Sequence, residues 1–441
     1  MIICAKIIIL LKNYNKFITI INPTPLICCI LLLFLDILQQ FTTKNFSFHT
    51  FQCCNFLFDK TQEKNYLCNM ILNDISILNF KNIEEASLRF SPKVNCFIGN
   101  NGMGKTNVLD AVYYLSFSKS YINQADSMVI RHNTEYMLIK GKYTRRDEHE
   151  EIVLSLQKGK RKTLKRNGKE YQKLSQHIGL LPTVMVSPMD WELIRGTGEE
   201  RRRLMDMIIS QSNPEYLATL IKYGKAIENR NIMIKKGYRD AILFETVEEQ
   251  ICTTAHYIHN CRKTWIEEFS PIFMDYYHKI SGSAETVNLS YNSHLNDMTM
   301  SDLLSLNRER DIALGYTSTG IHRDDIDLLL SDHSMRKIGS QGQCKTYTVA
   351  LRLAQYDFLK RVSGITPILL LDDIFDKLDT HRVENIISMV SNDSGFGQIF
   401  ITDTNRSHLD EIIKHIGSDY HIFEVNNGNI TPLDTGKETE K

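Results

Sequence analysis

The stretch VNCFIGNNGMGKT, residues 94–106, constrains the fold of this chain more than any other. Its last eight residues match the pattern G-x-x-x-x-G-K-T of a phosphate-binding loop: Gly99, Asn100, Asn101, Gly102, Met103, Gly104, Lys105 and Thr106. An apolar run precedes the loop and a helical pattern follows it. That context argues against a chance match in a glycine-rich turn, because loop N–H groups and a helix N-terminus then converge on one anion. The sequence predicts a sheet-based domain that binds ATP or GTP.

The chemistry of such a loop assigns roles to its last two residues. Lys105 is expected to reach the β- and γ-phosphates, and the Thr106 hydroxyl to ligate Mg²⁺. A second motif, PILLLDD at 367–373, has the pattern of a buried strand that ends in two carboxylates. We expect Asp372 to hold Mg²⁺ and Asp373 to polarise the attacking water, so Lys105 and Asp373 are the catalytic candidates. Paired acids after an apolar run are common, so this motif alone is less specific.

A third motif, GSQGQ at 339–343, precedes a predicted helix over 346–359. Ser340, Gly342 and Gln343 would offer a hydroxyl and N–H groups to a γ-phosphate at the N-terminus of that helix. The alternative is an ordinary helix with Ser340 as its N-cap. The position of the motif between the phosphate loop and the PILLLDD strand favours phosphate. Two copies would then complete each other's sites, which predicts an ATP-dependent homodimer.

Residues 1–69 differ in composition from the rest of the chain. They contain no glycine or arginine but six of the ten cysteines. We interpret this leader as a mis-annotated start, with the native start at Met70; a signal peptide or an anchor is the alternative. Its apolar run, residues 26–35, is shorter than the roughly 20 residues of a membrane span. Few cysteines follow, which fits a reducing compartment, so we expect a cytoplasmic protein with no membrane partner.

The pattern beyond residue 70 predicts a nucleotide domain that is divided by an insert. Residues 70–189 and 313–433 are expected to form the ATPase domain, and residues 434–441 a polar tail. Residues 190–312 show helical periodicity that only Pro214 and Pro271 interrupt. The turn signal Asn167-Gly168 predicts a hairpin rich in basic residues.

Two basic clusters are candidates for DNA contact. The hairpin contributes Lys160, Arg161, Lys162, Lys165 and Arg166, and the start of the insert contributes Arg201, Arg202 and Arg203. Alternating cations along a hairpin can follow a phosphate backbone. A solvated helix face or a strand edge protected by lysines is the alternative for each cluster. The segment His322-Arg323-Asp324-Asp325 fits zinc-ligand spacing poorly, so we interpret it as a turn.

From Met70 to about residue 433 the chain resembles the RecF family of bacterial DNA replication and repair ATPases. The resemblance rests on NFKNIEEASLRF, GNNGMGKTNVLDAVYYLSFSKS, VSPMDWELIRGTGEERRRLMD, YGKAIENRNIMIKK, TGIHRDDIDLLL, GSQGQCKTYTVALRLA and PILLLDDIFDKLD, in the order of the family. Three departures occur, at Met189, at residues 197–198 and at Ile321. None of them is a phosphate ligand, so they bear on subfamily rather than on class.

The resemblance implies an α/β fold: a P-loop ATPase head like those of ABC and SMC proteins, with an inserted helical second domain. It implies ATP and Mg²⁺ as cofactors and dimerisation on ATP. It also implies DNA binding at single-strand gaps and RecA loading with RecO and RecR. Slow, weakly DNA-stimulated ATP hydrolysis would then act as a release switch.

Two other functions stay open at this point: the ATP-binding subunit of an ABC-type transporter, and a structural DNA clamp that does not hydrolyse ATP. The insert and the missing switch histidine after residues 397–403 argue against the transporter. Thr402 and Thr404 are the candidates to replace that histidine. Lys81 and Asn82 are further expected to touch the nucleotide.

Overall fold

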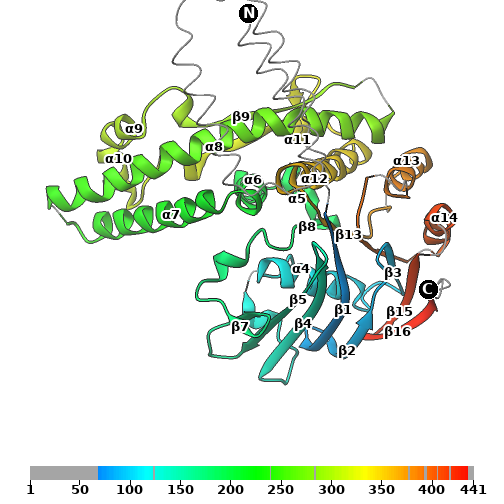
Figure 1. Cartoon of the computed structure of the whole chain (residues 1–441). Helices are drawn as coiled ribbons and strands as arrows, with labels where there is room; N and C mark the ends of the chain where they lie inside the picture. Colours follow the sequence, from blue (N-terminus) through cyan, green and yellow to red (C-terminus); the bar gives the residue numbers. More distant parts are fainter. Residues whose placement is uncertain are drawn as a thin grey trace, which may run out of the picture. The chain divides into compact units, whose positions relative to one another are not determined.

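The computed structural model describes residues 68–435, apart from 123–124, 239, 283–284, 376–377, 392–394, 405 and 417–418. The expectations for the leader and for most of the polar tail fall outside the described residues. Residues 66–441 form one compact unit (Figure 1). In the part of the chain that is described, no helix combines the length and apolarity of a membrane span.

The phosphate-binding strand lies inside a six-stranded sheet of order β16-β15-β3-β14-β13-β8. The strands are β3 (Val94–Ile98), β8 (Thr183–Val186), β13 (Ile368–Asp372), β14 (Ile399–Asp403), β15 (Tyr420–Asn426) and β16 (Asn429–Thr435). All pairs are parallel except β15 with β16. β8, β13 and β14 are buried along their whole length, which explains their continuous apolar runs.

A second, seven-stranded sheet packs against the first through helix α4 (Lys105–Phe117). Its strands are β1 (Cys68–Phe80), β2 (Ile83–Arg89), β4 (Tyr136–Arg145), β5 (Glu148–Gln157), β6 (Thr163–Arg166), β7 (Lys169–Glu170) and β12 (Ile365–Thr366). Helix α4 contacts strands of both sheets, so nearly all of its residues are buried (Figure 1). Asn167 and Gly168 adopt φ of 50° and 79°, which confirms the predicted two-residue turn between β6 and β7.

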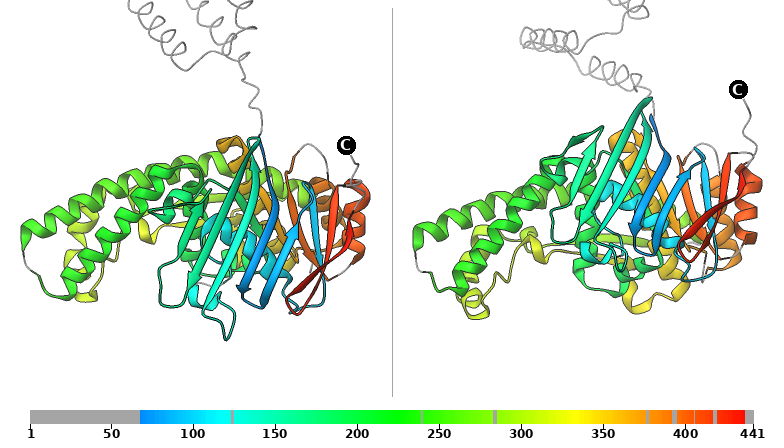
Figure 2. Two further views of the ribbon diagram at one scale, coloured as in Figure 1. Left: turned by 60° about the horizontal axis from the view of Figure 1, so that its bottom comes forward. Right: turned by 90° about the horizontal axis from the view of Figure 1, so that it is seen from below.

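Six helices follow β8: α5 (Trp191–Arg195), α6 (Gly198–Ser212), α7 (Pro214–Lys235), α8 (Ala241–Ser281), α9 (Met300–Leu306) and α10 (Arg308–Leu314). Helices α7 and α8 pack along each other (Figure 2). Pro214 is the first residue of α7, where its missing N–H leaves no bond unmade. Pro271 lies inside α8 without ending it, so the predicted interruption there is wrong.

The segment predicted to be wholly helical also contains a strand, β9 (Val287–Asn292). This strand pairs antiparallel with β10 (Asp325–Leu330), which in turn pairs with β11 (His333–Ser334). The alternating burial of β9, in on one face and out on the other, is typical of an antiparallel strand. Strands β9, β10 and β11 therefore form a small sheet apart from the two larger ones.

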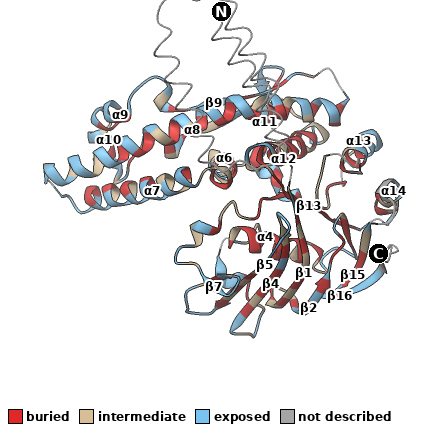
Figure 3. Ribbon diagram, viewed as in Figure 1, coloured by how far each residue is buried: buried red, intermediate tan, exposed pale blue. Residues whose placement is uncertain are grey.

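The chain returns to the ATPase sheet through α11 (Met335–Ile338) and the long helix α12 (Gln341–Ser363). Helix α12 packs against α8 on one side and lies close to β8 on another, so its middle is buried (Figure 3). Helices α13 (Thr380–Ser391) and α14 (Arg406–Ile416) follow β13 and β14. The parallel strands thus have the helical connections that such a sheet requires.

Candidate nucleotide-binding site

The phosphate loop joins β3 to α4, and its backbone depends on glycine. Gly102 and Gly104 have φ of 80° and 107°, in the left-handed region that other residues avoid. A Cβ at Gly104 would also lie 2.4 Å from Nδ2 of Asn82. The Lys105 ammonium donates to the carbonyl oxygens of Gly99 (2.7 Å) and Asn100 (3.1 Å). A loop curled around the first turn of a helix, with a lysine inside it, fits a triphosphate.

The side chains of the Mg²⁺ candidates Thr106 and Asp372 contact each other at the C-terminal end of β13. The Thr106 hydroxyl donates to Oδ1 of Asp372 at 2.9 Å, and the Thr402 hydroxyl donates to the same oxygen at 2.7 Å. Burial raises the pKa of Asp372, and these two hydrogen bonds oppose the shift. Burial also lowers the pKa of Lys105, while Asp373 and Asp372 oppose that shift. The hydroxyl and carboxylate oxygens are the hard ligands that Mg²⁺ prefers, so the donor set fits this ion.

Asp373 lies in an uncommon backbone conformation, with φ of 47°. Its N–H is directed at Thr402, 3.2 Å from the carbonyl oxygen and 3.1 Å from the hydroxyl. The Lys345 ammonium is 3.5 Å from the Asp373 carbonyl oxygen. Strained residues of this kind cluster at functional sites because the surrounding contacts hold them in place.

The two candidates for the missing switch histidine differ in their surroundings. Thr402 is fully buried, and its hydroxyl is bonded to Asp372. Thr404 follows the end of β14 and is exposed. Thr402 therefore orients the Asp372 carboxylate, whereas Thr404 is the candidate that solvent reaches.

Lys81, which is expected to touch the nucleotide, has a partner within the chain, and its nucleotide contact stays a prediction. Its ammonium forms an ion pair of 2.6 Å with Asp110 of α4, and both side chains are buried. Asn82 acts on the loop instead. Its amide donates to the Met103 carbonyl (3.1 Å), which also accepts from the Gly428 N–H (2.9 Å), and its carbonyl accepts from Asn107 (2.7 Å). Two turns from opposite ends of the described chain thus hold the phosphate loop.

Helix α12 begins at Gln341, five residues before its predicted start. Ser340 is its N-cap: the Ser340 hydroxyl oxygen accepts from the Gln343 N–H at 3.2 Å, and the Gln343 side chain accepts from the Ser340 N–H at 2.9 Å. This capping box uses the serine oxygen as an acceptor. The O–H of this exposed serine can still donate, so the cap and the phosphate interpretations are compatible. Gly342 lies against Arg382, whose Nη1 would be 2.7 Å from an added Cβ.

The hairpin cations fall into two groups. Lys162 is bound to Asp126 and to the Ser118 carbonyl, at 2.6 and 2.5 Å, and its side chain is only 7% exposed. Arg166 makes two bonds to the buried Glu150, at 2.5 and 2.7 Å. These two residues therefore stabilise the hairpin rather than face a ligand. The exposed candidates are Lys160, Arg161 and Lys165.

The arginines of α6 are also engaged with their own chain. Arg201 makes two bonds to Asp325, at 2.6 and 2.8 Å, and Arg202 donates to the Asp324 carbonyl at 2.6 Å. Exposed Arg203 pairs with Glu199 one turn earlier in the helix. Arg201 and Arg202 therefore hold α6 against the start of β10 and the residue before it, and Arg203 is the exposed arginine of the three.

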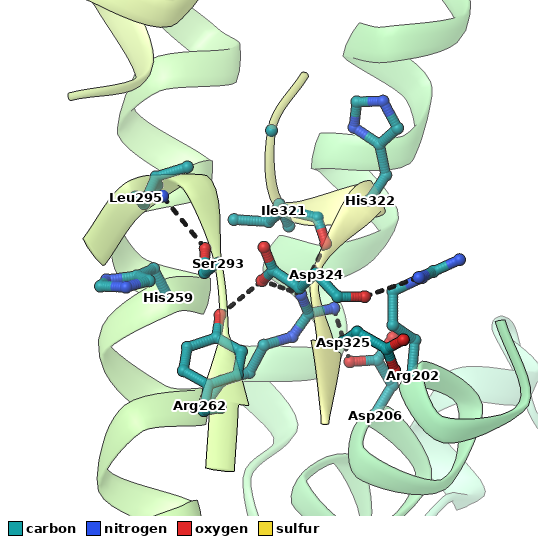
Figure 4. Close-up of polar contacts among 12 residues, drawn as sticks. Arg202, Asp206, His259, Arg262, Ser293, Leu295, Ile321, His322, Asp324 and Asp325 are labelled. Atoms are coloured by element: carbon teal, nitrogen blue, oxygen red, sulfur yellow. Dashed lines mark hydrogen bonds and ion pairs between the residues drawn. The ribbon is translucent and has the colours of Figure 1, made fainter. Parts of the chain in front are cut away.

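The segment 322–325 takes part in a buried ionic cluster (Figure 4). The Arg262 guanidinium, 1% exposed, binds Asp324 at 2.6 Å, Asp206 at 2.9 Å and the Ile321 carbonyl at 2.7 Å. Asp324 also accepts from the Tyr291 hydroxyl. In the described ranges, no group of three or more histidine, cysteine, aspartate or glutamate side chains is placed to hold a metal. Ile321–Arg323 form a short 3-10 helix and Asp325 begins β10, so the segment makes the connection into this strand.

Comparisons with known proteins agree with the motifs. Residues 71–431 match the family model described as RecF/RecN/SMC N terminal domain. The DNA replication and repair protein RecF of Parabacteroides distasonis is 52% identical over 365 residues, which cover 83% of this chain and all of that protein. The chain belongs to the RecF family. A second RecF, from Bacteroides thetaiotaomicron, is 51% identical over 366 residues, 82% of this chain and 99% of that protein.

Solved structures support the same family and fold. A RecF–ATP structure, described as a recombination mediator of the RecFOR pathway, superposes with a TM-score of 0.75 at 27% identity, covering 85% of this chain and 100% of that one. The Smc head domain of Pyrococcus furiosus shares the fold alone, with a TM-score of 0.51, 16% identity and coverage of 82% and 96%. The predicted RecF resemblance and the ABC/SMC-like head fold are therefore confirmed.

Proposed function

We propose that this RecF-family protein is an ATP-dependent DNA-binding protein of replication and recombinational repair. The observation that carries the proposal is the meeting of Thr106 and Asp372, 2.9 Å apart, beneath a loop whose lysine points inward. This arrangement binds a nucleotide triphosphate with Mg²⁺. A RecF relative whose solved structure is described as RecF–ATP supports ATP as the nucleotide.

Phosphate binding, metal binding and proton transfer are assigned to different residues of the site. The N–H groups of the loop and Lys105 bind the β- and γ-phosphates, and Thr106 and Asp372 hold Mg²⁺. Bound ATP supplies the phosphoryl group, and Mg²⁺ would neutralise negative charge on its phosphates. Asp373, next to Asp372 at the end of β13, accepts a proton from the attacking water. Membership of the RecF family supports slow hydrolysis that serves as a release switch.

The N-terminus of α12 supports the proposal of an ATP-dependent dimer. Ser340 is exposed, and its hydroxyl oxygen accepts from the Gln343 N–H in the first turn of α12, which leaves the hydroxyl proton free to donate. A helix N-terminus favours an anion. In a homodimer the ATP of the second copy provides this anion. Dimerisation should therefore require the γ-phosphate, which ADP lacks.

DNA binding is proposed for the exposed part of the hairpin surface, Lys160, Arg161 and Lys165. Family membership supports DNA at single-strand gaps as the target. It also supports RecO and RecR as partners in RecA loading in the cytoplasm. We further propose that the ATPase head comprises residues 70–189 and the strands and helices from α11 onward, with the inserted domain between them extended past residue 312 to β11. That extension follows from the pairing of β9 with β10.

Sedimentation of the full chain with ATP and with ADP tests the proposal. The wild type should dimerise with ATP only, and Lys105→Ala should bind no ATP and stay monomeric. A gapped duplex should raise the rate of ATP hydrolysis, which also separates this function from a non-hydrolysing clamp. A transporter subunit would show no response to DNA. A wild type that is monomeric with ATP, at concentrations that saturate the site, would contradict the proposal.

A further inference from the structure

A buried cluster of polar side chains, called the junction here, connects α4, the helix that follows the phosphate loop, to α12. At its centre is Asp190, 3% exposed, the last residue of a short 3-10 helix (Pro188–Asp190) that follows β8. Oδ1 of Asp190 accepts from the Arg352 guanidinium, at 2.6 Å from Nη2 and 3.1 Å from Nε, and also from the Tyr121 hydroxyl. Oδ2 accepts from the Ser187 N–H at 2.9 Å. Arg352 lies in the middle of α12 and is 4% exposed.

Tyr121 lies four residues after the end of α4 and is bonded both to this junction and to α4. Its hydroxyl donates to Asp190 and accepts from Nη2 of Arg352 at 2.8 Å. Its backbone N–H donates to Oδ1 of Asp110 in α4 at 2.6 Å. The hydroxyl of Ser120, one residue earlier, donates to Oδ2 of Asp110 at 2.6 Å. One residue is thus bonded to α4 through its main chain and to α12 through its side chain.

The position of Asp110 in α4 connects these hydrogen bonds to the residues of the nucleotide site. Thr106, which binds Asp372, lies four residues before Asp110, so the two side chains lie one helical turn apart. Lys81 forms an ion pair with Oδ2 of Asp110 at 2.6 Å, the oxygen that also accepts from Ser120. A shift of the first turn of α4 that accommodates phosphates therefore displaces Asp110 and, through it, Tyr121. Interiors are close-packed, so such a shift is passed on rather than absorbed.

The charges of the junction are stable over the physiological pH range. Burial raises the pKa of Tyr121 well above its usual value, so its hydroxyl remains a donor. Burial lowers the pKa of Arg352, but Asp190 and Tyr121 more than offset this effect, so the guanidinium stays charged. The Arg352 side chain has one further acceptor, Gln355, at 2.9 Å. The charged groups of the junction thus have their partners within the chain.

We propose that Tyr121 is a positioning residue that couples nucleotide binding at the phosphate loop to the orientation of α12, and hence to dimerisation. The inference rests on the proposed ATP-dependent dimer. Tyr121 touches neither the phosphate loop nor Ser340. It acts through Asp110 on one side and through Asp190 and Arg352 on the other. Arg352 is twelve residues beyond Ser340, on the order of 18 Å along the helix axis, so a small tilt there moves Ser340 appreciably.

The variant Tyr121→Phe tests the coupling, because it removes the hydroxyl and keeps the ring. Tyr113→Phe is the matched control: Tyr113 is a neighbouring buried tyrosine whose ring packs on Tyr121 at 5.1 Å and whose hydroxyl contacts Met207 instead. Two readouts are needed on the full chain. Hydrogen exchange follows residues 99–106 and 339–345 with and without ATP, and sedimentation gives the dimer dissociation constant.

In the wild type and in Tyr113→Phe, ATP should slow exchange at 99–106 and alter it at 339–345. In Tyr121→Phe, the effect at 99–106 and the ATP affinity should stay within twofold of the wild type. The ATP response at 339–345 should disappear, and the dimer dissociation constant should rise about tenfold or more, since α12 is no longer oriented.

The outcomes separate the inference from the proposed function. An unprotected phosphate loop in the wild type would refute the proposed function, and the coupling would fall with it. A protected loop without any response at 339–345 in the wild type would refute the coupling alone. So would a Tyr121→Phe protein that keeps the response and dimerises normally. An equal loss of ATP affinity and dimerisation in Tyr121→Phe would make Tyr121 a structural part of the nucleotide site, and would overturn its role as a coupler.

Discussion

Thr106 and Asp372 are 266 positions apart in the sequence, yet their side chains share a hydrogen bond of 2.9 Å. Thr402 donates to the same carboxylate oxygen from the neighbouring strand β14, at 2.7 Å. This buried oxygen thus accepts hydrogen bonds from two hydroxyl groups, one on α4 and one on β14. Five predictions follow from this oxygen, from its neighbours and from other sites in the fold.

Replacing Thr402 by valine should weaken Mg²⁺-dependent ATP binding. The buried Asp372 would lose one of the hydrogen bonds that oppose the rise of its pKa, so a smaller fraction would be ionised to hold the metal. The change should also cost about 1–2 kcal/mol of stability, because the Asp373 N–H loses one acceptor. Calorimetric titration with ATP at several Mg²⁺ concentrations measures the effect. Thr402→Ser, which restores the hydroxyl, should recover the affinity; a valine variant with normal Mg²⁺ dependence would argue against this role.

Asp373→Asn should bind ATP normally and form dimers that persist longer than those of the wild type. The amide keeps the shape of the side chain but cannot accept a proton from water, so hydrolysis slows while the phosphate contacts remain. Dimer lifetime after a chase with excess ADP is the measurement. Asp372→Asn is the control, and it should lose affinity because it removes the metal ligand. Equal lifetimes for Asp373→Asn and the wild type would assign proton transfer to another group.

Substitutions at Ser340 should distinguish the helix cap from the phosphate contact. Aspartate caps a helix about as well as serine, so Ser340→Asp should keep its thermal stability, whereas Ser340→Ala should lose about 1 kcal/mol. The aspartate carboxylate would repel a γ-phosphate, so Ser340→Asp, like Ser340→Arg, should bind ATP as a monomer. Sedimentation with ATP gives the answer. If Ser340→Asp dimerised like the wild type and only Ser340→Ala were impaired, Ser340 would be a cap and nothing more.

The exposed hairpin cations should govern the salt dependence of DNA binding. Neutralising Lys160, Arg161 and Lys165 together should weaken binding to all sequences. It should also reduce the slope of log K against log salt by about 0.9 for each lost phosphate contact. Lys162→Gln is the matched control on the same hairpin. Because Lys162 is bound to Asp126, this change should lower stability and leave the slope unaltered. An unchanged slope in the triple variant would move the DNA surface elsewhere, with Arg203 as the next residue to test.

His322 should make the protein less stable in mild acid. Burial lowers its pKa to about 4, although its hydrogen bond to the Thr317 carbonyl opposes the shift. The unfolded chain, with an ordinary histidine pKa of about 6.5, binds the proton first. The contribution of His322 is therefore complete above pH 6.5 and is lost as the pH falls toward 4, by about 2 kcal/mol between pH 7 and pH 5. His322→Gln should show a correspondingly flatter loss of stability in chemical unfolding at the two pH values. Parallel curves would contradict the assignment.

The parts of the site that short motifs encode could be predicted from the sequence. A glycine that must adopt positive φ, a lysine and a threonine at set spacing, and an apolar strand with acids at its end all carry local signals. Thr402 was a candidate because the apolar run 397–403 lacks the switch histidine and the family resemblance suggests a threonine in its place. Its bond to Asp372 rather than to a phosphate depends on strand register, which no local pattern encodes.

Charged residues that pair across long distances were harder to predict. Lys81 was expected at the nucleotide, but its partner Asp110 lies on the buried face of α4. Arg352 and Asp190 carry one usable signal: each is charged and falls within an otherwise apolar pattern, which predicts a buried partner without naming it. Strand β9 was missed although Val287, Leu289 and Tyr291 alternate with polar residues, a period-two signal that stands between two helical stretches.

The position of β3 in its sheet has a consequence for how the protein is made. The strand that carries the phosphate loop pairs with β14 on one side and β15 on the other, both from the last part of the chain. Nearby, Leu72 bonds with Gln398, 326 positions later. At a synthesis rate of roughly 5–20 residues per second, the N-terminal strands wait on the order of tens of seconds for these partners. On the ribosome, the nucleotide site of a nascent chain therefore remains unformed until almost the entire sequence has emerged, and β3 is exposed to chaperones or to aggregation during that time.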